Sequence, residues 1–168
     1  MIKTTQKTEQ VLKEIKDKRL AGVPIAEREK LIANHLPMVF RHFKGNYYVA
    51  LEIVHDCDKG EPVVVYQAVK DKKKWIRPLS SFASYVDNVK YPNVNQPFRL
   101  CTPNELFDLG YTFNDLAEDI DKLEIQGDRI KLNLKLMLLK LYEMYKLRKA
   151  KKGTNSNEKT KKETEQSK

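Results

Sequence analysis

Several features that mark common protein classes are scarce in this sequence of 168 residues. Its two cysteines, Cys57 and Cys101, are far apart and form no short-spaced metal-binding pair. A disulfide framework is therefore not expected, and two reduced thiols are typical of a cytoplasmic protein. The six glycines are scattered, and none of them forms the glycine-rich loop that cradles phosphate groups.

Long apolar runs are also lacking. The first ten residues, MIKTTQKTEQ, are polar and give no sign of a secretory signal. The most apolar window, residues 132–141, is interrupted by Asn133, Lys135 and Lys140 and is too short to cross a bilayer. We therefore expect a cytoplasmic protein that makes no contact with a membrane.

Charge, in contrast, is abundant and unevenly distributed along a chain whose formal net charge is +9. Residues 101–128 contain eight acidic residues and one lysine, whereas residues 129–168 contain thirteen basic residues and four acidic ones. This asymmetry indicates electrostatic pairing between molecules or contact with a polyanion. A solvated helix face followed by a disordered basic tail would give the same composition.

The N-terminal residues 1–37 predict a pair of helices. Apolar residues recur at helical spacing within residues 11–20, and Gly22 and Pro24 separate them from a second short helix over residues 25–36. Two helices joined by a short turn also have the outline of a DNA-binding helix-turn-helix, and that interpretation stays open.

Residues 38–100 change to a β pattern. Two segments rich in β-branched and aromatic residues, 47–54 and 62–69, flank the polar turn 56–61 and predict a hairpin. A third strand begins at Trp75, and Pro78 restricts it to an edge of the sheet. With shorter strands near residues 86–100, this pattern predicts an α+β fold built on a small, strongly bent antiparallel sheet or half-open barrel.

Residues 101–148 predict a helical region with a long amphipathic helix. Thr102, Pro103 and Glu105 have the layout of a capping box. Apolar positions then alternate by four and three residues, which is typical of a coiled-coil seam; they are Leu116, Ile120, Leu123, Gly127, Ile130, Leu134, Met137, Leu141 and Met144.

Two features qualify this C-terminal pattern. Residues 130–138 also alternate as a strand would, with a hairpin turn at residues 126–128, although a composition rich in Leu, Met and Lys favours a helix. From residue 149 to residue 168 the chain is basic and has almost no apolar residues, which predicts a disordered tail.

His42, His55 and Cys57 are the candidates for catalysis or metal binding. No acidic residue is obviously placed to orient either imidazole, as nucleophilic catalysis requires. His55, Asp56, Cys57 and Asp58 form a single local cluster, whereas zinc sites normally draw on a second one. We therefore assign no catalytic residue, no metal ligand and no cofactor.

Ligand binding fits the same region better. Aromatic rings stack on nucleobases, cationic side chains bind phosphate or carboxylate, and imidazoles hydrogen-bond polar edges. The predicted ligand-binding residues are His42, Lys44, Tyr48, His55, Tyr66, Trp75 and Arg77. An alternative stays open, in which the aromatic residues form the core, Trp75 plugs the barrel and Arg77 pairs with Glu61 or Asp87.

Residues 40–100 resemble a known family at anchors spread over about a third of the chain. The anchors include Arg41-His42-Phe43-Lys44-Gly45, Val65-Tyr66-Gln67-Ala68, Trp75-Ile76-Arg77-Pro78-Leu79 and Phe98-Arg99. They are similar to domain of unknown function family 1653, a small β domain of bacteria and phages. Ser81 stands where the family often has methionine. The resemblance implies a compact β domain and no established activity.

We therefore expect a non-enzymatic binding module that recognises an anionic small molecule, a nucleobase-containing ligand or nucleic acid. The long helix is expected to mediate homo-oligomerisation. Two alternatives stay open. One is an enzyme acting on a nucleotide or modified base with His42 or His55 as general acid or base. The other is a phage-encoded regulator whose helices and basic tail contact DNA or a host protein.

Overall fold

The computed structural model describes residues 23–125 and 127–165. Its elements in chain order are α2 (Ile25–Asn34), β1 (Met38–His42), β2 (Tyr47–His55), β3 (Pro62–Ala68), β4 (Lys74–Pro78), α3 (Leu79–Phe82), β5 (Leu100–Cys101), α4 (Pro103–Asp108), α5 (Phe113–Asp121) and α6 (Asp128–Glu165). The first predicted N-terminal helix lies outside the described residues, so the helix-turn-helix interpretation stays a prediction.

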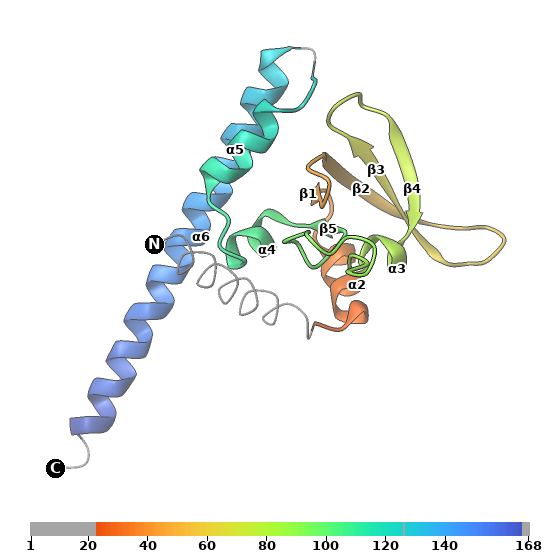
Figure 1. The fold of residues 1–168 in the computed structure, drawn as a ribbon. Helices are drawn as coiled ribbons and strands as arrows, with labels where there is room; N and C mark the ends of the chain where they lie inside the picture. The colour runs from red at the N-terminus through yellow and green to blue at the C-terminus, as the bar shows by residue number, and fades with distance from the viewer. Residues whose placement is uncertain (1–22, 126, 166–168) are drawn as a thin grey trace.

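The five strands form one antiparallel sheet in the order β4-β3-β2-β1-β5, which curls into a half-open barrel (Figure 1). A β-bulge between Ala50 and Glu52 bends β2 and shifts its register against β3. Because of this extra residue, Ile53 lies on the same face as Ala50 and packs in the same core. The predicted α+β fold with a strongly bent sheet is confirmed.

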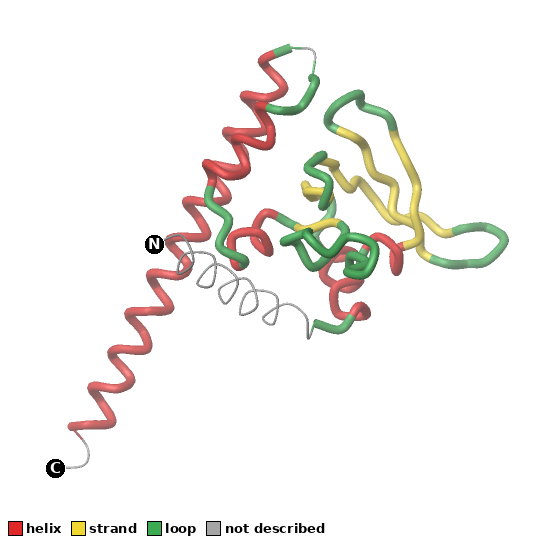
Figure 2. The backbone as a smooth tube through the Cα atoms, in the orientation of Figure 1, coloured by secondary structure: helices red, strands yellow, loops and turns green. Residues whose placement is uncertain are grey.

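The two faces of the sheet are covered by different helices. Phe40, Ala50 and Val64 point to the face that packs against α2 and α3. Val39 and Tyr47 point to the opposite face and share a second core with α4, α5 and α6. Residues 83–99, mostly loop, connect α3 to β5, and Figure 2 shows loop segments gathered around the short helices. The C-terminal helices are therefore packed on the β region and do not stand apart from it.

The single long helix expected through Gly127 is a helical hairpin. Gly127 has a φ of 103°, a left-handed conformation that glycine adopts easily, and it precedes the first residue of α6. α5 and α6 lie side by side (Figure 1), and Leu116 and Ile120 pack in one core with Leu134. The alternating residues 130–138 are helical, so the strand alternative is wrong.

Part of the charge asymmetry is neutralised by contacts inside the chain. The side chain of Asp121 at the end of α5 pairs with Lys135 of α6, and Lys131 donates a hydrogen bond to the Asp121 carbonyl. Asp108 of α4 accepts a hydrogen bond of 2.7 Å from Tyr145 and lies 3.5 Å from the ammonium of Lys149. The acidic segment and the first half of α6 therefore face each other within one molecule.

α6 continues to Glu165, past residue 149, where the composition predicts disorder. The segment contains no proline and is rich in Lys and Glu, which favour a helix even without an apolar face. Figure 1 shows this second half of α6 extending away from the other elements. None of the helices in the described ranges is long and apolar enough to cross a bilayer.

Arg28 fastens α2 to the rest of the molecule. Its side chain is 2% exposed and lies with the guanidinium carbon 3.7 Å from the centre of the Phe98 ring. It pairs with Glu105 of α4 at 2.9 Å and donates hydrogen bonds to the carbonyls of Ala83 and Leu100. These partners are themselves buried or half-buried, so the ion pair and hydrogen bonds offset the cost of burying the positive charge of Arg28.

Candidate functional site

The strand register brings five of the seven predicted ligand-binding residues to one face of the sheet. Tyr66 of β3 is directly opposite Trp75 of β4, and Arg77 follows two residues later on the same face. Tyr48 of β2 and His42 of β1 have the same orientation, because Phe40 is opposite Tyr48 and side chains alternate along a strand. This face is the one that α2 and α3 cover in part.

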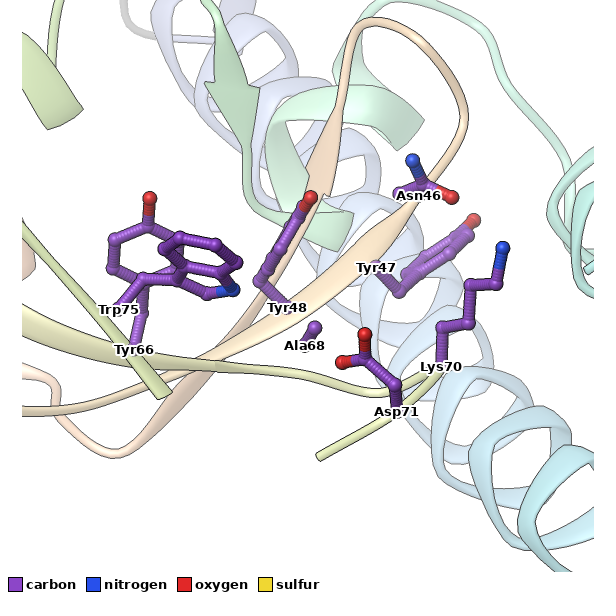
Figure 3. Close-up of a pocket in the computed structure, with 8 residues that line it drawn as sticks. All are labelled: Asn46, Tyr47, Tyr48, Tyr66, Ala68, Lys70, Asp71 and Trp75. Atoms are coloured by element: carbon purple, nitrogen blue, oxygen red, sulfur yellow. The ribbon is translucent and has the colours of Figure 1, made fainter. Parts of the chain in front are cut away.

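A cavity of about 160 Å³ opens at this face, between the start of β2 and the turn from β3 to β4. Figure 3 shows Trp75, Tyr66 and Tyr48 grouped at one end of it. The other end is polar, lined by Asn46, Tyr47, Lys70 and Asp71, with Ala68 in between. A ligand in this cavity would meet aromatic rings on one side and hydrogen-bonding groups on the other.

The aromatic residues divide between core and surface. Tyr66 is 8% exposed and packs edge-on against Tyr48 and Phe82, each ring centre 5.4 Å away. Tyr48 is half-buried, and Trp75 is 52% exposed. The open interpretation of these rings as core is therefore correct for Tyr66, whereas Trp75 does not plug the barrel.

Positive charges converge on His42. Burial of its ring, followed by the positive charges of Arg99, Lys44, Arg77 and Arg41, lowers the pKa of His42 from about 6.5 to about 4. The ring is therefore neutral at pH 7, and its Nδ1 accepts a hydrogen bond from the Lys44 backbone N–H at 3.2 Å. Among these cations, Arg41 forms an ion pair, with Asp119 at 2.7 Å.

The other cations have no carboxylate partner in the described part of the chain. Arg77 donates a hydrogen bond to the Ser81 hydroxyl at 3.3 Å, and it pairs with neither Glu61 nor Asp87. The ammonium of Lys44 lies 5.9 Å from the centre of the Phe43 ring and 5.7 Å from that of the Tyr91 ring. The internal ion pair considered for Arg77 is thus absent from residues 23–125 and 127–165.

His55 lies apart from these residues. It ends β2 opposite Pro62 and is exposed beside the β2–β3 turn. In that turn, Asp56, Cys57 and Asp58 have potential ligand atoms within 4.8 Å of one another. The Asp56 carboxylate, however, accepts hydrogen bonds from the backbone N–H groups of Lys59 and Asp58, which lower its pKa and close the turn. A turn-forming role accounts for Asp56.

The structure adds residues that the sequence prediction missed. Arg99 acts on His42 from the loop before β5, and Tyr91 packs on Phe43 with ring centres 4.8 Å apart. The Phe98-Arg99 anchor of the family resemblance is a signal that would have included Arg99. Asn46 and Asp71 lie in turns, where polar residues are ordinary, and nothing in the sequence distinguishes them.

Tyr47 lines the cavity, but its side chain points to the opposite face of the sheet and packs with α4, α5 and α6. The residue is 1% exposed, and its hydroxyl has no hydrogen-bond partner of good geometry among the described residues. Burial raises the pKa of this hydroxyl well above its ordinary value, and the nearby Asp119 carboxylate raises it further. The hydroxyl therefore stays protonated, in the core beside Arg41, Tyr111 and Asp119 and away from the cavity.

Comparison with known proteins identifies the β region. Residues 38–99 match the family model described as protein of unknown function (DUF1653). A crystal structure of a protein belonging to DUF1653 from Bordetella bronchiseptica is 30% identical in sequence, with a TM-score of 0.34, and the match covers 40% of this chain and 86% of that one. No curated protein matches the sequence. On the family match and on this identity over most of the relative's length, the chain belongs, through residues 38–99, to the DUF1653 family.

Proposed function

We propose that the protein is a non-enzymatic binding module that recognises an anionic or nucleobase-containing ligand on the sheet face defined by His42, Tyr48, Trp75 and Arg77. One observation carries the proposal. The cations Lys44, Arg77 and Arg99 surround a half-buried neutral histidine beside an open aromatic cavity, and no described carboxylate pairs with them.

The electrostatics of this sheet face favours the binding of an anion. Like charges gathered around a half-buried ring disfavour one another, and a bound phosphate or carboxylate relieves that repulsion. An arginine fork is suited to bind either group through two parallel hydrogen bonds. The aromatic cavity next to Arg77 supplies apolar area. A ligand with both an anionic group and a flat ring would therefore contact the cations with the one and the aromatic side chains with the other.

The same geometry favours binding over catalysis. A general base is most effective when its pKa is close to the working pH, and the pKa of His42 is about 4. The hydrogen bond at its Nδ1 comes from a backbone N–H, and no described carboxylate orients the ring. His42 is therefore better suited to donate or accept a hydrogen bond at a ligand than to transfer protons during turnover.

Calorimetry with nucleoside monophosphates and inorganic phosphate tests the proposal. We expect Arg77→Gln to weaken binding about tenfold or more, because a hydrogen bond to a charged group contributes about 1.5–3 kcal/mol. Lys59→Gln, in the exposed turn at the other end of β2, is the matched control and should bind as the wild type does. Equal affinity of Arg77→Gln and wild type, or no binding of any of these ligands, would contradict the proposal.

A further inference from the structure

Aromatic rings extend from the cavity across the sheet face and beyond it. The centre of the Tyr48 ring lies 5.4 Å from that of Tyr66 and 6.2 Å from that of His42. The His42 ring lies 4.4 Å from Phe43, which lies 4.8 Å from Tyr91. We refer to Trp75, Tyr48, His42, Phe43 and Tyr91 as the aromatic track. Each of these side chains is half-buried or exposed, so its ring retains accessible surface.

Cations accompany the track along its length. Lys44 and Lys90 lie over the Tyr91 ring, with their ammonium groups 5.7 and 5.5 Å from its centre. Arg99 and Arg77 act on the His42 ring in the middle, and Arg77 also lies close enough to Tyr48 to oppose the rise in the pKa of that hydroxyl. Positive charge alternating with flat rings is the pattern that binds a nucleic-acid backbone and its unpaired bases.

The size of the cavity limits what enters it. Pockets that enclose a whole drug-sized molecule measure about 300–1,000 Å³, whereas this one measures about 160 Å³. It therefore admits one ring, and the remainder of a ligand must lie outside, where the track continues. At its polar end, the Asn46 amide and the Asp71 carboxylate can hydrogen-bond the edge of that ring.

We propose that the aromatic track binds single-stranded nucleic acid, with one unstacked base in the cavity and neighbouring nucleotides running toward Tyr91. This inference rests on the proposed function and names its partner. A duplex is disfavoured, because its bases are stacked on each other and cannot present their faces to Trp75 or Tyr48. A free nucleotide shares the chemistry of one base and one phosphate, but it leaves Phe43, Tyr91 and Lys90 without a role.

The test compares three probes: a mixed-sequence single-stranded oligonucleotide, a duplex of the same length, and a nucleoside monophosphate. Trp75 is the only tryptophan, so its fluorescence reports stacking in the cavity directly. We expect the single strand to quench this fluorescence and to bind at least tenfold more tightly than either other probe. The affinity for the single strand should fall as salt is raised, because the bound phosphates release counterions.

Two pairs of variants separate ring stacking from other effects. Tyr91→Ala should weaken single-strand binding about tenfold and leave monophosphate binding unchanged, because stacking on one ring contributes about that factor. Tyr91→Phe keeps the ring and should bind as the wild type does. Trp75→Ala should weaken binding of the single strand, measured by anisotropy, and of the monophosphate, measured by calorimetry. Ile76→Ala, on the opposite face of β4 and 72% exposed, should weaken neither.

The outcomes distinguish this inference from the proposed function. If the monophosphate binds through Arg77 but the single strand binds no more tightly, or if Tyr91→Ala binds as Tyr91→Phe does, the track is overturned and the proposed function stands. Duplex binding equal to that of the single strand also overturns the track. If no probe binds and inorganic phosphate fails as well, both proposals fall.

Discussion

At the scale of single residues, His42 connects the site to the stability of the fold. Its ordinary pKa of about 6.5 falls to about 4 in the folded protein, because its ring is half-buried and surrounded by Arg99, Lys44, Arg77 and Arg41. As the pH falls below about 6.5, His42 binds a proton in the unfolded chain, whereas in the folded protein it stays neutral until the pH approaches 4. The free energy of unfolding should therefore decrease between about pH 6.5 and pH 4.

Urea denaturation of wild type and His42→Gln at pH 7 and pH 4.5 measures this effect. Carboxylates titrate in the same range in both proteins, so the difference between the two isolates His42. We expect wild type to lose about 1–2 kcal/mol more than the variant, after allowance for solvent screening at a half-buried ring. Parallel losses in the two proteins would mean that the cations do not act on His42 as the structure indicates.

The kinds of side chain at the candidate site were easier to predict from the sequence than the way in which those side chains are arranged. Trp75 and Arg77 could be placed on one face, because they are alternate residues of one strand. Tyr48 reaches that face only because of the β-bulge between Ala50 and Glu52, which a simple alternating pattern does not predict.

Tyr91 could not be predicted, because it lies in the loop 83–99, whose path follows from packing rather than from a local pattern. Arg99 lies in the same loop, and the Phe98-Arg99 anchor of the family resemblance is the signal that points to it. His55 is predicted with the others from its residue type and its place among the family anchors, whereas the length of β2 places it at the far end of that strand.

At the scale of elements, replacing Gly127 by alanine should change the stability in opposite directions in a continuous helix and in a helical hairpin. In a continuous helix, Gly127→Ala would stabilise the protein by about 1 kcal/mol, because alanine has the higher helix propensity. In the hairpin, residue 127 has a φ of 103°, where an alanine side chain is strained. We therefore expect Gly127→Ala to lower the free energy of unfolding by about 1–2 kcal/mol, as measured by urea denaturation. Gly153→Ala, inside α6, is the control and should not destabilise.

The spacing of apolar residues could not distinguish these two structures. A heptad-like pattern that continues across a turn is expected whenever two antiparallel helices bury facing stripes, as α5 and α6 do through Leu116, Ile120, Leu134 and Leu138. The distinguishing signal is local: Gln126-Gly127-Asp128 contains a glycine followed by an acidic residue at the first position of α6. The sequence does predict a turn at these residues, but as part of a strand hairpin rather than a helical one.

At the scale of the whole molecule, the C-terminal region is held to the DUF1653 region on the face opposite the candidate site. Arg41 of β1 pairs with Asp119 of α5, and Tyr47 of β2 packs in the core shared with α4, α5 and α6. Arg41 and Tyr47 adjoin His42 and Tyr48 in sequence. Helix packing on one face therefore fixes the backbone that carries the proposed ligand-binding residues on the other.

The same packing changes how self-association through the C-terminal helix must be tested. Leu134, in the predicted coiled-coil seam, is 6% exposed and buried against α5 within the chain, so a charge there would disrupt the fold itself. The stripe that remains accessible on α6 consists of Leu132, Leu136 and Leu139, which are 55%, 50% and 37% exposed. Their spacing of four and three residues is that of a short coiled-coil seam.

Self-association therefore predicts different results for two neighbouring leucines. Leu136→Glu should convert an oligomer into a monomer, detected by light scattering, that keeps the circular dichroism spectrum of the folded wild type. Leu134→Glu should instead lower the thermal midpoint, because it buries an unpaired carboxylate in the core. A wild-type protein that is already monomeric at high concentration would contradict the prediction. An oligomer that survives Leu136→Glu would show that molecules associate through a surface other than this face of α6.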